Sequence, residues 1–204
     1  MKKLLASAFI LTLAFSAFGK DSDNVAKTRK EVEAALPNYS VSIVTGPSAF
    51  HYYQALCGKS MLYKMEGALN QIKYVDIAAD KHYDLDPETK TGTVFNYTLP
   101  LSFDGNIANL LFVSDFYKDK MVKTGSEKII GRDATVYTAK LDPKNKKEEI
   151  KFWIDNEYGF ILKSVQTGSR NKTMEVTAFK AGGVTEKDCA FDLKDYKLTQ
   201  GGGD

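Results

Sequence analysis

Cysteine, histidine and tryptophan are scarce in this chain of 204 residues, which contains two cysteines, two histidines and one tryptophan. His51 and His82 lie far apart, and neither belongs to a His-Glu-x-x-His pair or a cysteine cluster of the kind that holds zinc. A glycine-rich nucleotide loop is also absent, and Gly46-Pro47-Ser48-Ala49-Phe50 lacks the second glycine of a nucleophile elbow. We therefore expect a non-enzymatic protein with no catalytic residue, metal or cofactor.

An excess of positive charge is lacking as well. The 28 basic residues fall to 26 if Lys2 and Lys3 are removed with a signal peptide, and this number equals that of the acidic residues. Binding to nucleic acid or to an anionic membrane surface through a polybasic patch needs a positive excess. The charge balance therefore argues against both classes of partner.

One long apolar run is present, and it lies at the N-terminus. Lys2 and Lys3 precede an uncharged stretch, 4–15, and Ala17-Phe18-Gly19 places small residues where a signal peptidase reads them. The run is shorter than the roughly 20 residues that span a bilayer. We predict a signal peptide at 1–19, cleaved after Gly19, and an exported chain that does not span the membrane. No cysteine lies near the cleavage point, which excludes a lipid-modified N-terminus and predicts a protein free in solution.

The two cysteines, Cys57 and Cys189, would then enter an oxidising compartment. They either form a disulfide or remain as two buried thiols, because sequence separation does not tell whether their Cβ atoms meet. A catalytic thiol is disfavoured, since neither histidine has a recognisable spacing to a cysteine.

Hydrophobic periodicity predicts a helix at 24–35 and a strand at 39–45, in which Tyr39, Val41 and Ile43 share one face. Asp86-Pro87-Glu88-Thr89-Lys90 is typical of a hairpin turn, and Gly159 suits a turn position with positive φ. One helix or two short ones are expected at 106–121. Further strands are expected at 60–66, 71–79, 81–85, 91–97, 128–141 with an interruption at Gly131, 148–155, 160–168 and 173–180.

These elements predict an α+β fold in which a strongly curved antiparallel sheet is covered on one face by its helices. The connections between strands are too short for parallel crossovers. Residues 20–198 are expected to form a single domain, because a chain of this size suits one core. The glycine-rich end, 199–204, is expected to be a disordered tail.

Three segments in the last third carry a resemblance to a known family. They are Gly131-Arg132-Asp133-Ala134-Thr135-Val136-Tyr137, the pair 151–155 and 159–163, and 176–179 running on to 190–193. Over 125–197 the chain resembles the periplasmic lipoprotein-carrier superfamily, which comprises LolA/LolB-like carriers and RseB-type sensors. The N-terminal helix and the strand after it agree in order. The carriers latch a helical lid with a basic side chain in the N-terminal strand region; here the chain departs from the pattern, because it offers only Arg29, in the helix, and has no arginine from 32 to 131.

The resemblance implies an unclosed half-barrel whose concave side, beneath the N-terminal helix and the helical insertion, is apolar. It implies a non-catalytic periplasmic protein that binds a hydrophobic ligand, either a lipid or the acyl chain of a lipoprotein, with outer-membrane lipoprotein sorting as one role. The alternative is an envelope sensor or protein-interaction module of the same fold, with an envelope protein as partner and no lipid cargo.

Eight apolar residues share faces of the expected strands and are candidates for the concave ligand-binding wall. Methionine and aromatic side chains adapt well to flexible ligands, although inward apolar side chains also fill an ordinary core. The candidates are Tyr39, Val41, Ile43, Met61, Tyr63, Met65, Phe152 and Ile154.

Overall fold

The computed structural model describes residues 25–46, 50–97, 99–140, 148–168 and 171–202. The predicted signal peptide at 1–19 lies outside the described residues. Among the described helices, none has both the length and the apolar character needed to cross a bilayer.

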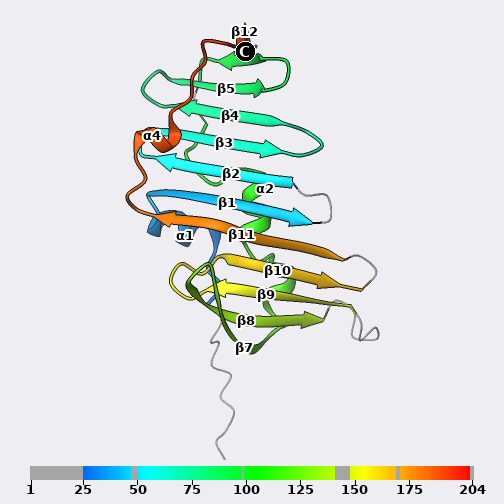
Figure 1. Ribbon diagram of the computed structural model, residues 1–204. Helices are drawn as coiled ribbons and strands as arrows, with labels where there is room; N and C mark the ends of the chain where they lie inside the picture. Colours follow the sequence, from blue (N-terminus) through cyan, green and yellow to red (C-terminus); the bar gives the residue numbers. More distant parts are fainter. Residues whose placement is uncertain (1–24, 47–49, 98, 141–147, 169–170, 203–204) are drawn as a thin grey trace, which may run out of the picture.

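The strands form one open sheet of twelve strands in the order β12-β6-β5-β4-β3-β2-β1-β11-β10-β9-β8-β7 (Figure 1). Neighbouring described strands pair antiparallel, except that β12 pairs parallel with β6. The strands are β1 Asn38–Gly46, β2 Phe50–Cys57, β3 Ser60–Glu66, β4 Gln71–Asp76, β5 Lys81–Asp86, β6 Thr91–Phe95, β7 Met121–Ile129, β8 Arg132–Lys140, β9 Glu149–Asp155, β10 Ile161–Thr167, β11 Lys172–Ala181 and β12 Lys197–Gln200.

Four short helices accompany the sheet: α1 Arg29–Ala35, α2 Gly105–Leu111, α3 Asp115–Lys118 and α4 Glu186–Cys189. Figure 1 shows α1 and α2 on one side of the sheet. The C-terminal segment, 184–200, which contains α4, lies on the other side. The predicted α+β architecture, an unclosed half-barrel with helices on its concave side, is confirmed.

The larger core lies between the concave face and the helices. Val32 of α1 and Ile107 and Leu111 of α2 pack in the same buried cluster as the inward side chains of the sheet. The inward residues alternate along β1, as the period of a half-buried strand requires. Helices α1 and α2 are thus held by the apolar faces that they bury, since helices of one or two turns are not stable alone.

A second core lies on the convex face of β2–β6. Val184 and Cys189 of the C-terminal segment pack there with Ala55, Leu62 and Tyr83. Cys57 and Cys189 are joined by a disulfide, so the first alternative for the two cysteines is confirmed. The opposite face of β2, β3 and β4 contributes Leu56, Met61, Tyr63 and Val75 to the concave core, so these three strands are buried on both sides.

Several predicted boundaries differ from the structure. The first helix begins at Arg29 because Thr28 and Glu31 form a capping box. The strand predicted at 128–141 is a hairpin of β7 and β8, since Ile130 and Gly131 take φ of 47° and 79° and form its two-residue turn. Because β7 already begins at Met121, the helical insertion is limited to α2 and α3.

Two further predictions were incomplete or wrong at the level of individual strands. No strand was predicted at 50–57, where the structure has β2. The C-terminal end was expected to be disordered from 199, but residues 199 and 200 belong to β12, and the backbone N–H of Gly201 donates to the carbonyl of Val94 over 2.8 Å. Backbone pairing with the edge of β6 orders this polar segment.

Candidate ligand-binding site

The eight predicted wall residues all lie in the concave core. Met65 is partly buried, and the other seven are at most 3% exposed. Tyr39 stacks on Phe103, which precedes α2, with the ring centroids 4.4 Å apart. The structure therefore brings the predicted residues together, but it covers them with the helical layer.

A buried polar network fixes that helical layer to the sheet. Gln54 of β2 is fully buried, and its amide nitrogen donates to the Tyr39 hydroxyl over 2.7 Å and to the Ser102 carbonyl over 2.8 Å. Its amide oxygen accepts from the backbone N–H of Asp104 over 2.9 Å. Asp104 is the N-cap of α2 and forms an ion pair with Lys73 of β4 over 2.9 Å. The start of α2 is thus tied to β2 and β4.

Arg29 makes a second connection, which lies within the helical layer that covers the sheet. Its guanidinium donates to the Ser102 hydroxyl over 2.7 Å and to the carbonyl of Phe103, and it pairs with Glu33 over 2.7 Å. The Glu33 carboxylate in turn accepts from the backbone N–H of Phe103. Arg29 therefore links α1 to the segment that leads into α2.

Burial keeps the inward tyrosines neutral. It raises the pKa of Tyr39 well above its ordinary value and raises the pKa of Tyr63 to about 12. A hydrogen bond from the Asn106 amide to the Tyr63 hydroxyl, 3.1 Å long, lowers the pKa of Tyr63 by a smaller amount. Both hydroxyls thus serve as uncharged partners within the concave core.

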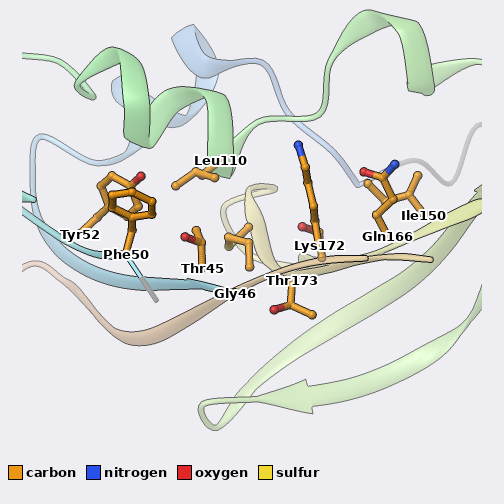
Figure 2. A pocket seen from close by; sticks show the side chains of 11 residues that line it. Thr45, Gly46, Phe50, Tyr52, Leu110, Ile150, Gln166, Lys172 and Thr173 are labelled. Atoms are coloured by element: carbon orange, nitrogen blue, oxygen red, sulfur yellow. The ribbon is translucent and has the colours of Figure 1, made fainter. Parts of the chain in front are cut away.

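A hollow of about 420 Å³ opens beside this core, where β1 and β10 end and β2, β9 and β11 begin. Leu110 of α2 lies above it, and the strands form its floor (Figure 2). None of the eight predicted wall residues lines it. The lining residues are Thr45, Gly46, Phe50, Tyr52, Leu110, Ile150, Ser164, Gln166, Lys172, Thr173 and Met174.

The backbone register explains why these side chains meet. Met174 and Lys172 precede the buried Val176 at intervals of two along β11, so they share the concave face. Opposite Lys172 on β10 stands Gln166, and opposite Met174 stands Ser164. A Cβ at Gly67 would lie 2.5 Å from Cδ1 of Phe50, so the glycine leaves room for that ring at one end of the hollow.

The two ends of the hollow differ in polarity. Figure 2 shows Phe50, Tyr52 and Leu110 toward one end, whereas Lys172 and Gln166 lie toward the other, where Ile150 is the apolar neighbour of Gln166. The Lys172 side chain extends from the floor toward the helical layer. Among the described residues that line the hollow, Lys172 is the one with a charged side chain, and no ion pair of Lys172 is found within the described part of the chain.

The described residues include no group of three or more histidine, cysteine, aspartate or glutamate side chains that could hold a metal ion. The arrangement instead suits binding of a molecule with an apolar part. Sequence reasoning missed the hollow because Phe50 and Tyr52 belong to a strand that was not predicted. The period-two spacing of Lys172, Met174 and Val176 was a signal that could have located its floor.

No family model matches the chain, and no curated protein matches its sequence. Among solved structures, the chain is similar to an uncharacterized conserved protein from Thermus thermophilus, with a TM-score of 0.49, 9% identity, and coverage of 84% of this chain and 95% of the other. It is similar to the MucA/MucB complex of Pseudomonas aeruginosa, with a TM-score of 0.46, 12% identity, and coverage of 83% and 61%. It is also similar to lipoprotein LppX from Mycobacterium tuberculosis, with a TM-score of 0.41, 11% identity, and coverage of 77% and 93%.

Proposed function

We propose that this protein is a non-catalytic binding protein of the bacterial envelope that holds the acyl chain of a lipid or lipoprotein in the hollow beneath α2. The observation that carries the proposal is the apolar end of the hollow, formed by Phe50, Tyr52 and Leu110. Shielding acyl CH₂ groups from water stabilises a complex by about 0.8 kcal/mol for each group buried.

The size of the hollow also supports this function. Its volume of about 420 Å³ falls within the range of roughly 300 to 1,000 Å³ that is usual for small-molecule sites. The hollow adjoins the concave core, because Tyr52 packs against that core and pairs with Ile43 of the predicted wall. The eight predicted wall residues would form a deeper surface, which a longer chain could reach after a displacement of α2.

The predicted export to the periplasm fits this role. Acyl chains cannot cross an aqueous compartment unless they are shielded, so a carrier or reservoir protein is useful there. Sorting of outer-membrane lipoproteins is one process that such a protein could serve.

Ligand retention tests the proposal. The protein is refolded without lipid, exposed to an extract of envelope lipids, and analysed by native mass spectrometry. We expect one acyl-containing molecule per chain. Leu110→Asp should abolish retention, because it places a carboxylate above the apolar end of the hollow.

Val122→Asp is the matched control. Val122 lies on the edge strand β7 with 65% of its surface exposed, so a carboxylate introduced there should leave retention intact. Circular dichroism would verify that both variants fold. If the native protein retains no acyl-containing molecule, or if folded Leu110→Asp retains as much as Val122→Asp, the proposal is wrong.

A second candidate function is an interaction module with a protein partner and no lipid cargo. It is favoured by β7, an edge strand that pairs only with β8 among the described strands and whose residues 122–128 are all exposed. A free edge can accept an extended peptide as an additional strand.

A photoreactive residue at Ser126 should then capture one defined envelope protein, whereas the same residue at Thr177, exposed on β11, should not. Equal capture at both positions would count against this candidate.

A further inference from the structure

We infer that the hollow is selective for a single-chain anionic amphiphile, namely a fatty acid, whose carboxylate binds Lys172. This inference rests on the proposed function and adds the class of ligand and the residue that recognises it.

Charge complementarity is the first argument. The Nζ atom of Lys172 extends into the space between floor and helical layer, and no carboxylate is found among the lining residues that would neutralise it. Gln166, its cross-strand neighbour on β10, adds an amide that can donate a hydrogen bond to the same anion. An anionic headgroup would be attracted to this end of the hollow, and a cationic one would be repelled.

The arrangement of polar and apolar groups is the second argument. The lysine and the glutamine lie toward one end, together with Ile150, while Phe50, Tyr52 and Leu110 lie toward the other (Figure 2). The two aromatic rings are 6.3 Å apart between centroids and present a broad apolar surface. A molecule with a charged head and an apolar tail therefore matches the hollow along its length.

The volume is the third argument. About 420 Å³ is in the lower part of the range for small-molecule sites, which suits one acyl chain better than the several chains of a phospholipid or triacylated lipoprotein. A fatty acid combines one chain with a single negative charge, and a single ammonium group is available to meet it.

Two probes with the same chain and opposite charge test the inference. The native protein is titrated calorimetrically at about pH 8 with dodecanoate and with dodecyltrimethylammonium, each below its micellar concentration. We expect dodecanoate to bind at least about tenfold more tightly, the ratio that one charge-assisted hydrogen bond typically gives. Lys172→Gln should remove this preference, and Lys172→Glu should reverse it.

Lys180→Gln is the matched control. Lys180 lies on the same strand with half of its side chain exposed, and it interacts with Asp188 of α4 at 3.8 Å. This variant should keep the native preference for dodecanoate. If the native protein binds both probes with equal affinity, or if Lys172→Gln leaves their ratio unchanged, Lys172 does not select the headgroup. Binding of neither probe would contradict the proposed function as well, so the two failures can be told apart.

Discussion

The side-chain oxygen of Gln54 accepts a hydrogen bond of 2.9 Å from the backbone N–H of Asp104, the N-cap residue of α2. This contact joins the middle of β2 to the point where the covering helix begins. The other half of the same amide binds Ser102 and Tyr39. One buried glutamine thus fixes the position of α2 over the concave face, and with it the position of Leu110 above the hollow.

Replacement of this glutamine should destabilise the fold. We expect Gln54→Leu to lower the free energy of unfolding by about 1–3 kcal/mol, because the backbone groups of Ser102 and Asp104 lose their partner inside the protein. Urea unfolding at neutral pH would measure the change. Gln200→Leu, an exposed position on β12, should alter stability by less than about 0.5 kcal/mol. Equal stabilities of the two variants would show that the network does not hold α2.

The disulfide between Cys57 and Cys189 should hold the C-terminal segment on the convex face. The double variant Cys57→Ala/Cys189→Ala should be less stable by about 2–4 kcal/mol, since the cross-link restricts the unfolded chain. Hydrogen exchange should accelerate more at 184–200 than in β1 and β11, because the segment packs on β2–β6 and not on the concave core. Uniform acceleration across the sheet would contradict this assignment.

Alkaline pH should destabilise the concave core. The pKa of Tyr63 is raised to about 12 in the folded protein, so the unfolded chain loses its proton first, near its ordinary value of 10. The contribution of Tyr63 to stability should therefore be constant below about pH 9 and be lost as the pH rises from about 10 toward 12. Tyr63→Phe should reduce the fall, and the part that remains would come from groups such as Tyr39, whose pKa is also raised. Unfolding free energies measured between about pH 8 and pH 11.5 would test this; an identical fall in the variant would rule out a contribution from Tyr63.

Local sequence patterns predicted much of the fold. The alternation of Tyr39, Val41 and Ile43 correctly located β1, and the turn residues at 86–90 correctly joined β5 to β6. Gly159 has the expected positive φ, 76°. These features depend on neighbours in the chain, so a single sequence is sufficient to identify them.

The parts that were missed depend on distant contacts. In β2 the four residues Gln54, Ala55, Leu56 and Cys57 are all buried, because helices cover one face and the C-terminal segment covers the other. Such a strand shows no alternation. The polar strand β12 is likewise ordered by pairing with β6, about 100 residues earlier in the chain. The hollow combines residues from five strands and α2, so its location could not be read from any one segment.

Photo-crosslinking with a diazirine-labelled fatty acid is the most direct test of ligand binding beneath α2. After irradiation and digestion, we expect the label on Tyr52, Leu110 or Met174, which surround the hollow, and we expect unlabelled dodecanoate to compete for these positions. Labelling confined to the convex face, or labelling that dodecanoate does not reduce, would contradict the proposed site.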